Sequence, residues 1–119
     1  MFNLPGETSV YLAEHPADLR RSFDGLAAIV EGQFGMSVIS GSVFVFLNRR
    51  GNQARLLFWE RNGLCILAKR LDSGVFRRVK SSSGQQECVE IDGGQLAALL
   101  EGVPSRRPRR RTKTERFAA

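Results

Sequence analysis

The feature that most constrains the fold is an uninterrupted apolar run, Ser42-Val-Phe-Val-Phe-Leu47, near the middle of the 119-residue chain. A strand with one solvated face alternates apolar and polar side chains, whereas a strand covered on both faces is apolar throughout. The run stops at Asn48-Arg-Arg-Gly-Asn52, whose residue types favour turns. We therefore predict a strand over residues 42–47 that is covered on both faces.

A series of strands joined by turns is expected after this run. Residues 54–60 and 64–71 flank Asn62-Gly63, a dipeptide that strongly favours a β-hairpin. Asp72-Ser-Gly74 then precedes a fourth strand over residues 75–79. This spacing predicts an antiparallel meander with three hairpin connections.

The segments on either side supply helices and further strands. A first strand is predicted over residues 8–14, and residues 87–91 have a weak strand pattern. Between residues 17 and 34, apolar residues recur at steps of three and four, as on one face of an amphipathic helix. Asp92 is a suitable N-cap for a short helix that ends at Gly102. The predicted fold is α+β: a mostly antiparallel sheet of five or six strands, one long amphipathic helix after the first strand, and a short C-terminal helix.

The net charge of the chain comes from its last residues. Eighteen Lys and Arg against twelve Asp and Glu give +6, and residues 104–119, with seven basic side chains and one acidic, account for all of it. Residues 1–103 sum to zero, and a chain that is 42% hydrophobic is too apolar to be disordered throughout. We predict a single domain over residues 1–103 and a disordered Arg-rich tail over residues 104–119.

Within the neutral body, the charges separate along the sequence. Residues 1–48 sum to −3, residues 49–80 to +7 and residues 81–103 to −4. A basic ribbon that also carries aromatic rings can hold phosphates and stack on bases. The candidate nucleic-acid-binding residues of this ribbon are Arg49, Arg50, Arg55, Trp59, Arg61, Arg70, Arg77 and Arg78.

The expected positions of these residues are what make them candidates. Arg49 and Arg50 fall at one predicted hairpin tip and Arg61 at the next. Arg55 and Trp59 alternate onto the same strand face, which would put a guanidinium beside an indole. Two alternatives remain open: the ribbon could be a solvated or internally paired face that limits edge-to-edge association, or a protein-docking surface. Trp59 could also be a core residue, which is the more common role of a tryptophan on a strand.

The tail supplies a second set of candidates. Basic residues spaced by Pro108 cannot build a core and favour an extended arm that binds polyanions. Such an arm contacts phosphates and does not read bases; the alternative is a solubilising terminus. Its candidate residues are Arg106, Arg107, Arg109, Arg110, Arg111 and Lys113.

The residues give little support to an enzyme. His15 is the only histidine, and the acidic residues form no tight cluster resembling a two-metal nuclease site. Gly51 and Gly63 are not followed by a helix that could cradle a phosphate. Cys65 and Cys88 are too few for a disulfide scaffold and make no zinc site without other ligands. We predict no catalytic residue, no metal and no cofactor.

The sequence also points away from membranes and secretion. No apolar run approaches the roughly 20 residues that cross a bilayer. The first residues lack the basic start and apolar stretch of a secretory signal. We expect a cytoplasmic protein that associates with the nucleoid.

Five segments in register carry a resemblance to a known family. They are Arg20-Arg-Ser-Phe-Asp-Gly-Leu-Ala27, Gly41-Ser-Val-Phe-Val-Phe-Leu-Asn-Arg-Arg-Gly51, Leu57-Phe-Trp-Glu-Arg-Asn-Gly-Leu-Cys65, Lys69-Arg-Leu71 and Gln95-Leu-Ala-Ala-Leu-Leu-Glu-Gly102. Over residues 8–103, the chain resembles the TnpB accessory proteins of the insertion-sequence-sixty-six family of bacterial transposable elements, which are distinct from the RNA-guided nuclease of the same name. The resemblance implies a small protein without catalytic residues, encoded beside a DDE-type transposase and needed for efficient transposition. Arg77-Arg78-Val79 departs from the aromatic residue and proline expected there, so any contact that the family makes at this point would be altered.

The residues and the resemblance together predict a non-catalytic accessory protein for DNA transposition. It would bind DNA, with the element ends as a candidate target, through the hairpin tips and the tail, and assist the transposase of the same element. One alternative is an adaptor that docks on the transposase with little or no DNA contact. Another is an RNA-binding regulator that uses the same basic ribbon.

Overall fold

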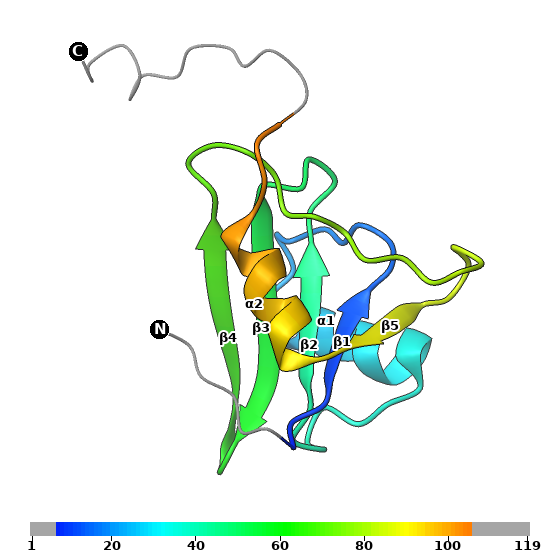
Figure 1. Cartoon of the computed structure of the whole chain (residues 1–119). Helices are drawn as coiled ribbons and strands as arrows, with labels where there is room; N and C mark the ends of the chain where they lie inside the picture. The colour runs from blue at the N-terminus through cyan, green and yellow to red at the C-terminus, as the bar shows by residue number, and fades with distance from the viewer. Residues whose placement is uncertain (1–6, 106–119) are drawn as a thin grey trace.

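The apolar run forms the central strand of a five-stranded sheet in the computed structural model, which describes residues 7–105 (Figure 1). The strands are β1 (Val10–Ala13), β2 (Val43–Leu47), β3 (Gln53–Glu60), β4 (Gly63–Arg70) and β5 (Cys88–Ile91). Their order across the sheet is β4-β3-β2-β1-β5. β1 and β2 are parallel, and the other neighbouring pairs are antiparallel. The α+β class and the mostly antiparallel sheet are therefore confirmed.

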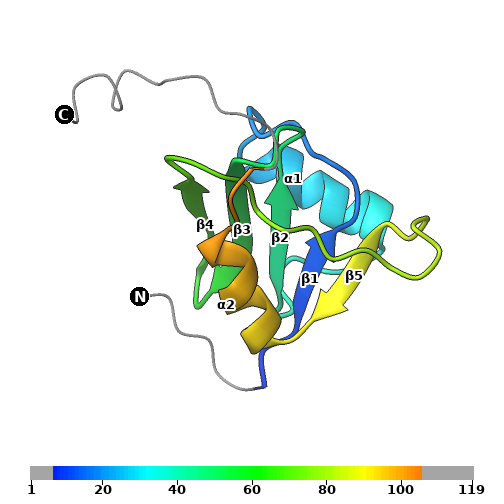
Figure 2. The same cartoon turned by 45° about the horizontal axis from the view of Figure 1, so that its top comes forward.

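Helices cover both faces of this sheet (Figure 2). α1 (Phe23–Ile29) continues into a π-helical segment, η1 (Val30–Phe34), on one face, and α2 (Gly93–Glu101) lies on the other. Between these two layers, all five residues of β2 are buried. The apolar run is thus explained, because side chains that point either way from β2 enter a hydrophobic core.

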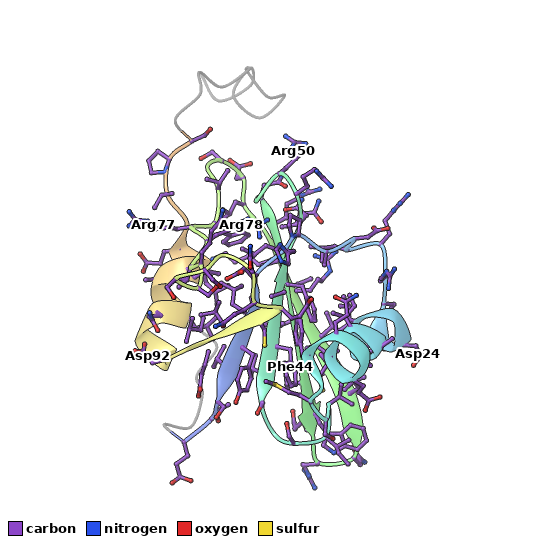
Figure 3. The ribbon with its side chains drawn as sticks, turned by 90° about the vertical axis from the view of Figure 1, so that its right-hand side faces the viewer. Asp24, Phe44, Arg50, Arg77, Arg78 and Asp92 are labelled. Carbon is purple, nitrogen blue, oxygen red and sulfur yellow. The ribbon has the colours of Figure 1, made fainter. Side chains whose placement is uncertain are left out.

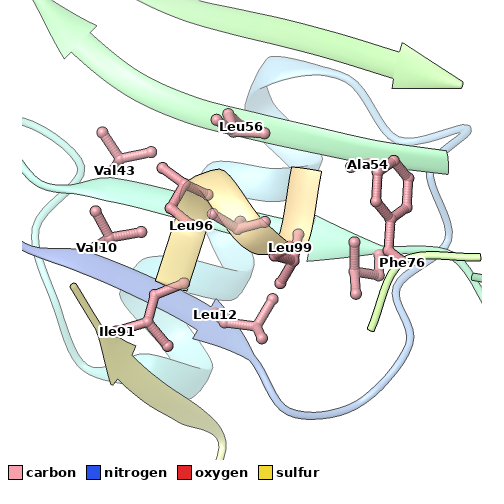
Figure 4. Packing of buried hydrophobic residues seen from close by; sticks show 11 residues of the cluster. Val10, Leu12, Val43, Ala54, Leu56, Phe76, Ile91, Leu96 and Leu99 are labelled. Carbon is pink, nitrogen blue, oxygen red and sulfur yellow. The ribbon is translucent and has the colours of Figure 1, made fainter. Parts of the chain in front are cut away.

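The two cores use alternate residues of the same strands. On the α1 side, Phe44 and Phe46 pack with Leu26 and Val30. Rings also stack there, since the centroids of Phe34 and Phe46 are 5.9 Å apart. The core on the α2 side is made by residues from four strands, from α2 and from the segment after β4 (Figure 4): Val10, Leu12, Val43, Val45, Leu47, Ala54, Leu56, Phe76, Ile91, Leu96 and Leu99.

The start of α2 agrees with the sequence prediction. The carboxylate of Asp92 accepts a hydrogen bond from the backbone N–H of Gln95 at 2.7 Å, and the Gln95 side chain accepts one from the backbone N–H of Asp92 at 2.9 Å. This reciprocal pair is a capping box, which satisfies two helix-terminal donors. At the other end, Lys69 donates to the carbonyl of Leu100 at 2.7 Å, where a cation favours the helix dipole.

The helix predicted over residues 17–34 starts later and is not α-helical throughout. Asp18 accepts hydrogen bonds from the backbone and side chain of Arg20, and the N–H of Ala17 bonds to the carbonyl of Leu47 at 2.9 Å. These bonds hold residues 17–22 outside the helix. Gly35, with φ of 67°, ends the helical segment in the left-handed conformation that glycine favours.

The predicted fourth strand of the meander is wrong. Val75 makes only an isolated bridge to Val103, and the next N–H, that of Phe76, bonds to the carbonyl of Gly51 at 2.7 Å. Phe76 is buried in the α2-side core, so this segment crosses the end of the sheet instead of extending its edge. The meander therefore contains three strands, β2 to β4, and two hairpin connections.

Two further predictions concern the C-terminal tail and the absence of membrane-spanning segments. The predicted basic tail lies outside the described residues except for Pro104 and Ser105. No helix within residues 7–105 is both long enough and apolar enough to span a bilayer.

Candidate nucleic-acid interface

The two hairpin turns lie at opposite ends of the sheet, which divides the predicted basic ribbon. Arg49 and Arg50 are in the β2–β3 turn, whereas Arg61 is in the β3–β4 turn. β3 has eight residues, so the turns are separated by roughly 25 Å at about 3.4 Å per residue. Consecutive turns of a meander must alternate between ends, and this rule was available from the sequence.

The β3–β4 turn, which we call the far turn because it lies at the opposite end of the sheet from the β2–β3 turn, differs in detail from the prediction. Glu60 pairs with Gly63, so the two loop residues are Arg61 and Asn62, not Asn62-Gly63. Arg61 takes the left-handed conformation, with φ of 55°. The indole N–H of Trp59 donates to the carbonyl of Arg61 at 3.2 Å, so this tryptophan supports the far turn.

Arg55 and Trp59 share a strand face, as predicted, but they are not adjacent. They are four positions apart in β3, which is about 13 Å along a strand, and Leu57 lies between them in the α1-side core. Both side chains are half-buried. The expected pairing of a guanidinium with an indole is therefore wrong.

The remaining candidate arginines of residues 49–80 gather at the end of the sheet that holds the β2–β3 turn. Arg70 pairs with Gln53 at the start of β3, and Arg77 follows the segment that crosses this end. We call the cations Arg49, Arg50, Arg70, Arg77 and Arg78 the basic end. In Figure 3 the three labelled arginines of this group, Arg50, Arg77 and Arg78, lie higher in the view than the acidic residues Asp24 and Asp92. Four of the five are exposed, and Arg78 is half-buried.

Arg78 has a structural position within this group. Its Nη2 donates to the carbonyl of Asn48 at 2.6 Å, which ties the crossing segment to the β2–β3 turn. Nη1 is buried without a hydrogen-bond partner among the described residues. Burial lowers the pKa of this guanidinium from its ordinary value. Arg78 is thus placed to hold the turn in position, and the exposed arginines around it are the ones open to a ligand.

A cleft joins the basic end to a loop that precedes α1. Its volume is about 830 Å³. It brings Arg49, Arg50 and Arg55 together with Arg20 and Asp18. The candidate residues did not include Arg20, because the helical periodicity placed it on a polar helix face. The missed signal was Asp18 two residues before Arg20, a spacing typical of side-chain-capped turns.

The charges of this cleft are fixed at neutral pH. Arg20 holds the Asp18 carboxylate with Nε and Nη2, each 3.0 Å from one oxygen. These hydrogen bonds lower the pKa of Asp18 to about 2, and the same contact raises the pKa of Arg20. Four arginines and one aspartate therefore give the cleft a net charge of +3.

The acidic flanks do not neutralise the basic end through direct contacts. Within residues 7–105, the Arg20–Asp18 pair is the one ion pair formed. Asp92 caps α2, and Glu14, 4% exposed, accepts a hydrogen bond from the backbone N–H of Ser81 at 2.6 Å. Hydrogen bonds from the side chain and backbone of Ser81 lower the pKa of Glu14. The internally paired alternative thus has no support in the described part of the chain.

Metal-binding chemistry has no candidate constellation in the same region of the chain. Across the described residues, no three His, Cys, Asp or Glu side chains gather closely enough to hold an ion. The polar groups that do gather are guanidinium donors, which bind oxyanions bidentately. The geometry of the basic end is therefore suited to phosphate or carboxylate ligands.

Comparisons with known proteins identify the family. A protein-family profile described as "IS66 Orf2 like protein" matches residues 8–110. Two relatives come from Sinorhizobium fredii: "Uncharacterized protein y4hO" is 31% identical over 99 residues, covering 83% of this chain and 84% of the relative. "Uncharacterized protein y4jC" is 33% identical over 104 residues, covering 86% and 85%. No solved structure gives a significant match. The chain belongs to the IS66 Orf2-like family and is thus an accessory protein with a transposition-associated role, as the resemblance predicted.

Proposed function

We propose that this protein binds DNA phosphates at its basic end and through its Arg-rich tail, and thereby assists the transposase of its element without itself performing catalysis. The tail residues are Arg106, Arg107, Arg109, Arg110, Arg111 and Lys113. The contacts are made to the backbone of the duplex. They position the protein on DNA and carry no sequence information of their own.

One observation carries this proposal: four exposed arginines gather at one end of the sheet, and none of them forms an ion pair with another residue of the described range 7–105. Unpaired exposed cations are what phosphates recognise, since each contact releases a condensed counterion. Hydrogen bonds hold the backbone there, because Phe76 and Arg78 donate to carbonyls of the β2–β3 turn, those of Gly51 and Asn48. An ordered basic surface of this kind presents its charges in a fixed arrangement.

The tail is tethered to the same end. Val103 bonds to Val75 through both backbone groups, at 2.8 and 2.9 Å. The described chain therefore leaves the domain at Ser105 beside the basic end (Figure 1). Linked binding elements act at a high effective concentration for one another. The tail and the basic end are thus suited to the same stretch of DNA.

The adaptor alternative has one observation in its favour. Large apolar side chains on the α1 side are exposed, with Ile39 62% and Phe23 44% accessible to solvent. Such residues are available for a protein contact. DNA binding and docking on the transposase are compatible, because neither Phe23 nor Ile39 belongs to the basic end.

Gel shifts with a labelled duplex test the proposal. The full chain should shift the duplex at low salt. Changing Arg106, Arg107, Arg109, Arg110 and Arg111 of the tail to Gln should weaken the shift uniformly across sequences. Excess single-stranded RNA should compete no better than duplex DNA. If the intact protein fails to shift DNA at low salt while the transposase co-purifies with it, the adaptor function replaces this proposal. Preferential competition by RNA would indicate the regulator.

A further inference from the structure

The cleft beside the basic end has two walls, one held by a backbone hydrogen bond and the other by side-chain hydrogen bonds of Asn48. Ala17 bonds to the carbonyl of Leu47 at 2.9 Å and fixes the loop of residues 16–20 against the end of β2. Asn48 fixes the opposite wall, because its Oδ1 accepts from the N–H of Gln53 at 3.0 Å and its Nδ2 donates to Asn52 at 2.7 Å. The cleft is therefore preorganised, which reduces the entropic cost of binding.

The lining favours a phosphate over a base. Arg20, Arg49, Arg50 and Arg55 supply guanidinium donors, whose forked geometry matches phosphate oxygens. The described residues that line the cleft include no aromatic ring, so they offer no platform on which a base could stack. Its volume of about 830 Å³ is large enough for a phosphate together with the sugar attached to it.

Among the described residues that line the cleft, Asp18 alone carries a negative charge that opposes an anion. Its two carboxylate oxygens already occupy the Arg20 fork in the bidentate geometry that a phosphate would take. The Arg20 side chain is 92% exposed and that of Asp18 is 46% exposed. Exposed pairs of this kind are weak and are exchanged readily for another partner.

We propose that this cleft is a phosphate-binding site within the DNA-binding surface, and that Asp18 is a built-in competitor which occupies Arg20 until a phosphate displaces it. The inference rests on the proposed function for the identity of the natural ligand, a DNA backbone phosphate. The site itself is defined by oxyanion chemistry and also accepts a free polyphosphate.

The test compares two substitutions in the full chain that remove the same charge. Asp18→Asn frees Arg20 while keeping a side-chain oxygen for the Arg20 backbone N–H. Asp24→Asn is the matched control, because Asp24 is an exposed residue of α1 that lies away from the basic end (Figure 3). Affinity for inorganic tripolyphosphate is measured by calorimetry and affinity for a labelled duplex by fluorescence anisotropy.

Asp18→Asn should tighten binding of both ligands about threefold, the size of one exposed charge contact. The salt dependence for DNA should steepen by about 0.9 in log–log slope, as for one added phosphate contact. Asp24→Asn should leave both unchanged, and adding Arg20→Gln to Asp18→Asn should remove the gain. Circular dichroism confirms that each variant is folded.

The outcomes separate this inference from the proposed function. Equal effects of Asp18→Asn and Asp24→Asn, or a gain that persists without Arg20, would overturn the cleft proposal even if the wild-type protein binds DNA. Tripolyphosphate binding that follows the expected pattern, in a protein that does not bind duplex DNA, would support the cleft and refute DNA as its ligand.

Discussion

Replacing Arg49 and Arg50 with Ala should reduce the salt dependence of DNA binding by a calculable amount. Each phosphate contact contributes about −0.9 to the slope of log affinity against log salt, so losing two contacts should flatten the slope by about 1.8. Both side chains are exposed at the β2–β3 turn and form no ion pair within the described residues, so their removal should leave the fold intact.

The same numbers give a change in affinity. Raising the salt fourfold, from 50 to 200 mM, weakens each phosphate contact about 3.5-fold, and two contacts about 12-fold. The wild-type protein should therefore lose about 12 times more affinity over this range than the double variant. Fluorescence anisotropy with a labelled duplex at five salt concentrations measures both slopes.

A single-site comparison keeps this prediction specific to one end of the sheet. Arg50→Ala should flatten the slope by about 0.9, whereas Arg61→Asn should leave it unchanged. Asn suits the left-handed conformation of residue 61, so the far turn is preserved. Equal slopes for these two variants would refute the assignment of DNA contact to the basic end. An unchanged slope in the folded Arg49→Ala, Arg50→Ala variant would refute it as well.

Three further predictions concern the architecture. Gly74→Ala should lower the stability by about 1–3 kcal/mol in urea titrations, because residue 74 has φ of 85° and a Cβ there would meet the carbonyl oxygen of Val103; unchanged stability would contradict the close approach. Asp92→Ala should cost about 0.5–2 kcal/mol through loss of the capping box, and a melting temperature equal to that of the wild type would argue against it. Because hydrogen bonds from Ser81 lower the pKa of Glu14 in the folded protein, this carboxylate stabilises the fold at pH values above its ordinary pKa of 4.5. This contribution to stability should be lost as the pH falls below 4.5. Glu14→Gln should lose that part of the acid dependence, and an identical pH profile would exclude the contact with Ser81 as its source.

Local signals predicted the elements that local forces determine. The apolar run of β2 indicated burial on both faces, and the Asp92 cap indicated the start of α2, because each pattern is complete within a few residues. Val75 and Phe76 are also residue types that favour strands, and this local signal predicted a fourth strand of the meander. Phe76 instead packs into a core assembled from distant strands. Residues 17–22 were misassigned because side-chain hydrogen bonds between Asp18 and Arg20 compete with helix formation.

The candidate site was predicted in composition and not in arrangement. The sequence shows that residues 49–80 are basic, but the meander sends Arg61 to one end and Arg49 to the other. Arg20 joins the site only because Ala17 is bonded to the end of β2, a contact between residues 30 positions apart. Such long-range contacts leave no periodic signal in a single sequence.

The most direct measurement is a titration of the ¹⁵N-labelled full chain with duplex DNA, followed by amide chemical shifts. The account predicts that residues 48–53 and 77–78 shift progressively, together with residues 18–20 of the cleft. Residues 60–63, at the far turn, should stay unchanged and serve as the internal reference. Shifts centred on the far turn, or on the exposed residues Phe23 and Ile39, would contradict the claim that DNA is bound at the basic end.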